Sequence, residues 1–255
     1  MNLFRNILRV SAVAILLAIV CPADATAGSQ QPVRDYATIS AKAGRFFKYR
    51  EWANAAAMYE LMIEDSASVP MNYANAIVVA GMRNLPDYQM SVFERSQSNL
   101  VPMAQVLQGV RQVSFSLGEA GLYERFLHLL LERQPWLGRS IDRQLLDYYL
   151  FRRDADGIVR MSRLMLSTAP DNTNYLNSLA DGLILQSKYE ESADVYRKIL
   201  VLEPNNLTAL LALGNYLFIN KQPDEALPYL SQANRIAPSP DLAEKIKQCR
   251  ADSRP

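Results

Sequence analysis

The sequence predicts an all-α fold, a right-handed α-solenoid of about six helix-turn-helix units that ends in a capping helix. Apolar side chains recur at helical spacing, and the ten glycines do not punctuate alternating, strand-like runs. Proline also recurs at intervals of 32 to 35 residues, at Pro70, Pro102, Pro135, Pro170, Pro204 and Pro238. Because a proline cannot continue a helix, one proline per period marks the break between successive helical units.

Residues 1–27 have the layout of a secretory signal peptide. Arg5 and Arg9 precede an uncharged run over residues 10–20, and small residues follow that run. Eleven helical residues rise about 16 Å, short of the roughly 30 Å core of a bilayer, so we expect no stable membrane anchor after signal removal. Cleavage after Ala25 and cleavage after Ala27 both fit. The sequence therefore predicts an exported protein, periplasmic or secreted.

The cysteines and the net charge indicate whether the chain is lipidated, whether it has a disulfide and which classes of ligand it disfavours. Cys21 stands where a bacterial lipoprotein carries its lipid-modified residue, but Val20 before it disfavours lipidation. Cys249 would be the lone cysteine of the mature chain, so the fold is expected to rely on packing without a disulfide. Removing residues 1–27 balances basic and acidic residues at 25 each. A net charge of zero argues against a general nucleic-acid binder or a polybasic membrane binder.

Residues 28–36 are expected to form a flexible N-terminal segment, and residues 37–170 to form four degenerate units. The first unit has small and aromatic residues at regular places, namely Ala43, Phe46, Trp52, Ala55 and Tyr59. In the second unit Pro86 opens the second helix, where its missing N–H costs nothing. In the fourth unit Ile158 and Met165 replace small residues, so we expect the third and fourth helix pairs to be splayed or irregular.

Residues 171–238 form two well-matched units. Each has two apolar stripes at helical spacing, the first pair being Leu176–Leu183 and Tyr189–Leu200. In the last unit Gly214 and Ala226 are small, which lets the two helices approach closely. Residues 239–255 are expected to form the capping helix and a frayed tail, since a terminal repeat needs a polar outer face.

These two units resemble the tetratricopeptide repeat family, whose 34-residue helix-turn-helix carries a Leu-Gly or Leu-Ala pair, an aromatic residue, a small residue and a closing proline. The matching residues are Leu179-Ala180, Tyr189, Tyr196 and Pro204, then Leu213-Gly214, Ala226 and Pro238. The resemblance is specific over residues 173–238 and fades upstream. It implies a protein-protein interaction scaffold, not an enzyme, that binds a protein or peptide partner in a concave groove lined by the first helix of each pair.

Carried over residue by residue, the family's groove positions fall at Ser140, Arg143, Asp147, Leu150, Asn174, Asn177, Asp181, Ile184, Thr208, Leu211, Asn215 and Phe218. Amides can pair with a peptide backbone while Leu211 and Phe218 accept side chains. Replacing Asn215 and Phe218 by alanine is predicted to weaken partner capture and leave helicity unchanged. Some family members clamp a terminal carboxylate with lysines and asparagines, but the lysines are missing here, so we expect no clamp. The alternative that these are simply solvated helix faces stays open.

Other candidate sites have structural explanations. His128, the sole histidine, stands among leucines and is expected to be a packing or surface residue. No His/Cys cluster, phosphate-binding glycine loop or Gly-x-Ser-x-Gly motif is present, so the sequence predicts no metal, no cofactor and no catalytic residue. The carboxylate pairs that begin at Glu190 and Asp224 fall at expected helix starts, where they complement the helix dipole. Of Tyr148, Tyr149 and Phe151, at least one is expected to face inward, and the rest could form a docking surface.

Two alternatives to the scaffold stay open. One is a helical envelope enzyme that acts on glycan through a pair of carboxylates around one cleft. The other is a structural subunit of an envelope complex whose groove is filled by residues 28–36 or by a second copy of the chain. The identity of the partner, the pathway, the oligomeric state, and whether the groove holds peptide or glycan are not determined by the sequence.

Overall fold

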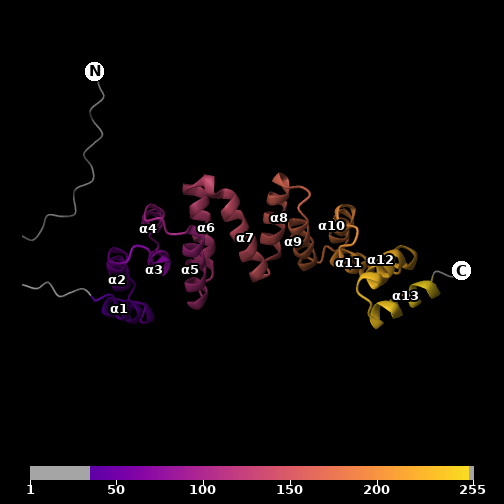
Figure 1. Ribbon diagram of the computed structural model, residues 1–255, viewed down its shortest axis with the longest axis horizontal. Helices are drawn as coiled ribbons and strands as arrows, with labels where there is room; N and C mark the ends of the chain where they lie inside the picture. Colours follow the sequence, from indigo (N-terminus) through magenta and orange to yellow (C-terminus); the bar gives the residue numbers. More distant parts are fainter. Residues whose placement is uncertain (1–34, 253–255) are drawn as a thin grey trace, which may run out of the picture.

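The computed structural model describes residues 35–252, and all regular structure in that range is helical (Figure 1). The helices, in chain order, are α1 (Tyr36–Lys48), α2 (Trp52–Asp65), α3 (Pro70–Met82), α4 (Pro86–Ser98), α5 (Met103–Ser116), α6 (Gly121–Arg133), the 3-10 helix η1 (Pro135–Leu137), α7 (Gly138–Arg152), α8 (Ala155–Thr168), α9 (Thr173–Leu185), α10 (Tyr189–Leu202), α11 (Leu207–Ile219), α12 (Pro223–Ile236) and α13 (Pro240–Asp252). The expected signal peptide, its cleavage sites and Cys21 lie outside the described residues.

The helices form six pairs followed by α13, so the predicted solenoid with its capping helix is confirmed. Each proline of the period lies at or just before the start of a pair or, for Pro238, of the capping helix: Pro70 begins α3, and Pro204 shortly precedes α11. The first pair begins at Tyr36, inside the segment that was expected to be flexible. There Asp35 caps α1 by accepting hydrogen bonds from the backbone N–H groups of Ala37 and Thr38, both at 3.2 Å.

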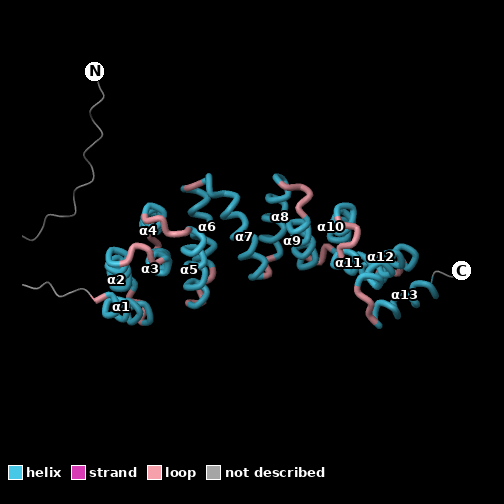
Figure 2. Tube along the Cα trace, in the orientation of Figure 1, coloured by secondary structure: helices cyan, strands magenta, loops and turns pink. Residues whose placement is uncertain are grey.

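The array forms an arch in Figure 1, with both ends lower than the middle. Helices α4, α6, α8 and α10 lie along its upper, outer edge, and α3, α5, α9 and α11 lie nearer its lower, inner edge. Short loops join them throughout (Figure 2). Because α3, α5, α9 and α11 are the first helices of their pairs, first helices line one side of the molecule, as the groove prediction requires.

No helix in the described range is long and apolar enough to cross a membrane.

The turn inside each pair repeats one backbone conformation. A residue in the left-handed region occurs at Arg50, Asn84, Gly118, Arg153, Ser187 and Lys221, with φ between 53° and 75°. The N–H after it bonds back to a carbonyl five residues earlier, as from Lys188 to Leu183 at 2.9 Å. This is the Schellman closure of a helix, which satisfies carbonyls at the end of the first helix. It recurs every 34 or 35 residues, so the turns follow the same period as the prolines.

The first and last pairs have buried residues twelve positions apart on their two helices, Ala43 with Ala55 and Gly214 with Ala226. A Cβ on Gly214 would lie 2.8 Å from Leu230 on α12, so only glycine allows this approach. In the fifth pair the equivalent contact is polar, because Ser192 Oγ donates to the Ala180 carbonyl at 3.3 Å. The expected role of small residues at the crossing is thus what the structure shows in the last unit.

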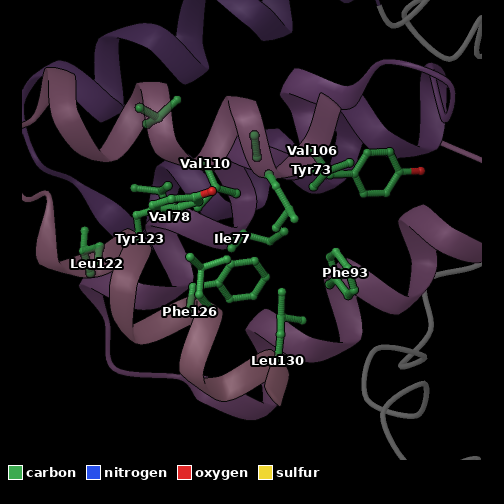
Figure 3. Packing of buried hydrophobic residues seen from close by; sticks show 14 of the residues in the cluster. Tyr73, Ile77, Val78, Phe93, Val106, Val110, Leu122, Tyr123, Phe126 and Leu130 are labelled. Carbon is green, nitrogen blue, oxygen red and sulfur yellow. The ribbon is translucent and has the colours of Figure 1, made fainter. Parts of the chain in front are cut away.

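The third pair is irregular, in line with its degenerate sequence. The connection from α4 to α5 passes through Leu100, whose φ of 57° differs from the extended caps that join the other pairs. After this turn α5 packs chiefly on α3 and only sparsely on α6. The core between α4 and α6 is filled by large rings, as the edge-to-face pair Phe93 and Phe126, with centroids 5.8 Å apart, shows (Figure 3).

The fourth pair closes in an unexpected way. Gly157, one residue before Ile158, is the small residue of this unit, and a Cβ there would lie 2.4 Å from the ring of Tyr149 on α7. Ile158 is itself buried and faces the next pair, where a Cβ on Gly182 would lie 2.8 Å from it. The small residue of α8 that packs against α7 is therefore Gly157, and the large Ile158 packs against the small Gly182 of α9. Met165 is buried in the core as well.

Candidate functional site

The predicted groove residues lie on α7, α9 and α11, the first helices of the last three pairs. They occupy equivalent positions, since Arg143, Asn177 and Leu211 are 34 residues apart in succession. Asp147, Asp181 and Asn215 form a second such series. We call the surface formed by these positions on the three helices the inner face.

None of the inner-face residues is buried, although their neighbours at helical spacing form the core. The exposed members are Arg143, Asp147, Asn174, Asp181 and Thr208, and the partly buried members are Asn177, Leu211, Asn215 and Phe218. Leu211 and Phe218 pack against the core of the last two pairs. These two side chains therefore support the fold as well as offering apolar surface.

Asn215 has a partner that the sequence did not indicate. Its Oδ1 accepts a hydrogen bond from Lys245 Nζ at 3.0 Å, and the same ammonium pairs with Asp241 at 2.9 Å. Lys245 belongs to α13 and stands 34 residues after Leu211, so it continues the repeat of the inner-face positions. The expectation that lysines are missing from this face is therefore wrong at its C-terminal end. The repeat spacing, extended into the capping helix, could have found it.

The middle of the inner face holds two polar groups in partly dry surroundings. The Oδ1 of Asn177 is buried and has no hydrogen-bond partner among the described residues. Asp181 keeps an exposed surface, but the protein atoms packed around its carboxyl partly desolvate it and raise its pKa above its ordinary value. Leaving a buried acceptor unpaired costs about 1 to 3 kcal/mol, so this part of the face is not optimised for stability alone.

His128 is exposed on α6 and belongs to a polar cluster around Tyr149 on the outer side. Its Nε2 lies 3.4 Å from the Tyr149 hydroxyl, which donates to Glu124 at 2.7 Å and accepts from Arg160 at 3.3 Å. Burial, followed by the bond to Glu124, raises the pKa of Tyr149 to about 12. This cluster joins α6, α7 and α8, and its geometry is that of a packing contact. Within residues 35–252 no His, Cys, Asp and Glu side chains gather in threes that could hold a metal ion.

The three aromatic residues of α7 divide between core and surface. Tyr148 and Tyr149 are buried, whereas Phe151 is 62% exposed. The Phe151 ring meets Phe115 of α5 at 5.1 Å, edge to face. The guanidinium of Arg111, also on α5, lies over both rings. Sequence reasoning missed Arg111 and Phe115, although their spacing of four residues places them on one helix face.

The carboxylate pairs of α10 and α12 lie in the first turns of their helices, as expected. Glu191 is paired with Arg163 of α8 at 3.4 Å and with Lys188 at 3.8 Å. Glu225 accepts a hydrogen bond from Gln222 at 3.2 Å. These contacts are the ordinary roles of acidic residues at helix N-termini.

Comparison with solved structures finds proteins with similar helical arrays. One is the C-terminal part of a TPR repeat-containing protein from Cytophaga hutchinsonii, at 13% identity and a TM-score of 0.46, covering 79% of each chain. Another is the TPR2AB domain of yeast Sti1 in complex with pHSP90, at 13% identity and a TM-score of 0.35, covering 85% of this chain and 97% of that one. A third is YrrB, described as a TPR protein with an unusual peptide-binding site, at 14% identity and a TM-score of 0.31, covering 84% and 92%.

Neither a protein-family model nor a curated protein sequence matches this chain. The architecture therefore stands on the packing itself: six helix pairs, a turn of one conformation in each, and small residues where the last pair crosses. The array of helix pairs that the sequence predicted is thus confirmed at the level of the fold, and it resembles that of tetratricopeptide repeat proteins.

Proposed function

We propose that this tetratricopeptide-like array is an interaction scaffold in the cell envelope that binds an extended segment of a protein partner along its inner face. The observation that carries the proposal is the repetition of the face. Positions on α7, α9 and α11 that are 34 residues apart all keep some exposure, while most of the residues between them are buried in the core. A surface repeated on successive helices suits a ligand that is itself linear and repetitive, such as an extended peptide.

The chemistry of the inner face supports a peptide backbone as ligand. Asn174, Asn177 and Thr208 offer amide and hydroxyl groups that both donate and accept, as backbone N–H and C=O groups require. Ile184 and Phe218, near the ends of their helices, offer apolar surface to side chains. Location in the envelope is supported by the signal-like layout of residues 1–27.

The test is affinity capture from the envelope fraction of the source cell, with the full chain as bait. A variant with Asn174→Lys and Thr208→Lys places two long side chains on the inner face, at exposed positions whose side chains make no hydrogen bond in the described part of the chain. We expect this variant to lose the captured partner. The matched control, Leu164→Lys with Val201→Lys, adds the same charge at exposed sites on α8 and α10 and should retain it.

Equal capture by both double variants would remove the inner face as the binding site. The pair Asn215→Ala and Phe218→Ala is a less clean probe than the sequence suggested. Phe218 packs against the core and Asn215 holds Lys245, so their removal is expected to lower stability as well as binding. Circular dichroism melts of each variant separate these two effects.

A further inference from the structure

Arg111 on α5 lies against a pair of aromatic rings that contact each other edge to face. Its guanidinium carbon lies 5.6 Å from the ring centroid of Phe115 and 5.4 Å from that of Phe151 on α7. Contact with the rings stabilises the cation and restricts the movement of the guanidinium. The arginine is partly buried and Phe151 is exposed, so this cluster reaches the surface.

The charge of Arg111 is not neutralised by an ion pair. In the described part of the chain no carboxylate lies within 4 Å of it, and the same holds for the other arginines of the two helices, residues 139, 143 and 152. Helices α5 and α7 together carry these four arginines against two aspartates, Asp142 and Asp147. Helices α9 and α11 carry a single charged residue, Asp181. Positive charge on the first helices of the last four pairs is thus confined to α5 and α7.

A planar guanidinium with free N–H groups suits one ligand chemistry above others. A carboxylate takes two parallel N–H···O bonds from it, and such charge-assisted pairs are about twice as strong as neutral hydrogen bonds. The rings restrict the arginine before the ligand arrives, which lowers the entropy lost on binding. Asp147 lies near enough that its charge and that of Arg111 both act on Tyr123, but it makes no ion pair with Arg111. Its charge opposes an incoming carboxylate.

We infer that Arg111, held against the edge-to-face pair of Phe115 and Phe151, binds the carboxylate of an aspartate or glutamate side chain in the partner segment. This inference rests on the proposed peptide-binding function and extends the inner face from α7 to α5. It divides the partner segment into two parts: an acidic residue over α5 and α7, and residues that meet amides and apolar groups over α9 and α11.

The first experiment selects 12-residue peptides from a random phage-displayed library on the immobilised full chain. We expect Asp and Glu to be enriched several-fold over the input library. The enrichment should disappear with Arg111→Gln and persist with Arg125→Gln, a matched loss of one positive charge at an exposed site on α6. Circular dichroism of Arg111→Gln checks that the helices are intact.

The second experiment measures the affinity of one selected peptide by fluorescence anisotropy. Arg111→Gln is expected to weaken binding about tenfold, and a Glu→Gln change in the peptide should cause the same loss. Combining both changes should cost no more than either alone, because they remove one interaction. Asp147→Asn should strengthen binding of the acidic peptide, and Phe151→Leu should weaken it.

The outcomes separate the two proposals. Selected peptides without acidic enrichment, or additive losses in the double change, would overturn the role of Arg111 and leave the peptide-binding function standing. Selection of no peptide at all would remove the binding function and this inference with it. Arg111→Lys distinguishes charge alone from the stacked, forked guanidinium, since it should recover only part of the affinity.

Discussion

At the scale of the residue, the left-handed turn inside each pair is the feature that is hardest to predict from the sequence. Five of the six turn residues in the left-handed region are not glycine, namely Arg50, Asn84, Arg153, Ser187 and Lys221. That conformation costs most side chains about 1 to 2 kcal/mol. The fold accepts the cost because the following N–H closes the helix and sets the direction of the second one. These positions share a conformation rather than a residue type, so composition alone does not reveal them.

Ser187→Gly is therefore expected to raise the free energy of unfolding by about 0.5 to 1 kcal/mol, since relief of the backbone strain exceeds the greater chain entropy of an unfolded glycine. The side chain of Ser187 is exposed, so no packing is lost. Urea unfolding measures the change. Ser178→Gly, within α9, is the control and should lower stability by about the same amount. A destabilised Ser187→Gly would show that the turn is not strained.

At the scale of the element, glycine decides how closely the two helices of a pair approach. Gly214 faces Leu230 at a distance that leaves no room for a methyl group, whereas Gly44 on α1 has nothing within 4 Å of its would-be Cβ. Both are helix-interior glycines with the same intrinsic cost of about 1 kcal/mol relative to alanine. Only the surroundings differ, which makes the two residues a matched pair.

Gly214→Ala is expected to lower the free energy of unfolding by about 1 to 2 kcal/mol, because the new methyl group would force Leu230 out of its place in a closed core. Gly44→Ala should raise it by about 0.5 to 1 kcal/mol, because it gains helix propensity at no steric cost. Thermal denaturation followed by circular dichroism compares the two. Equal effects of the same sign would mean that propensity, not packing, governs both sites.

At the scale of the whole molecule, the period could be read from the sequence because prolines recur every 32 to 35 residues at the breaks between pairs, although Pro228 lies within α12. The number of pairs, their limits within a few residues and the first-helix positions of the inner face followed from it. The exceptions arise where long-range contacts decide: α5 turns toward α3 after Leu100, and Lys245 reaches Asn215 across thirty residues. The stacking of Arg111 on Phe151 likewise joins residues forty apart. No local sequence pattern predicts such long-range contacts.

The hydrophobic core of the whole molecule is divided into separate clusters. One buried cluster runs from Ile39 to Met165 and a second from Leu176 to Cys249. Between them Val159 of α8 meets Leu179 and Leu183 of α9 in a small third cluster. In a repeat array each unit is stabilised by its neighbours, so this contact, together with that of Ile158 with Gly182, couples the two halves.

Leu183→Ala is expected to weaken that coupling by about 2 to 4 kcal/mol, since Leu183 is fully buried at the junction. Both tryptophans, Trp52 and Trp136, lie in the first half, whereas the circular dichroism signal comes from all helices. In urea the variant should therefore lose part of its helicity before its tryptophan fluorescence changes. Leu164→Ala, at an exposed site on α8, should leave the two probes as they are in the unmodified chain. If both probes shift together in Leu183→Ala, the junction does not separate the halves and the array unfolds as a single cooperative unit.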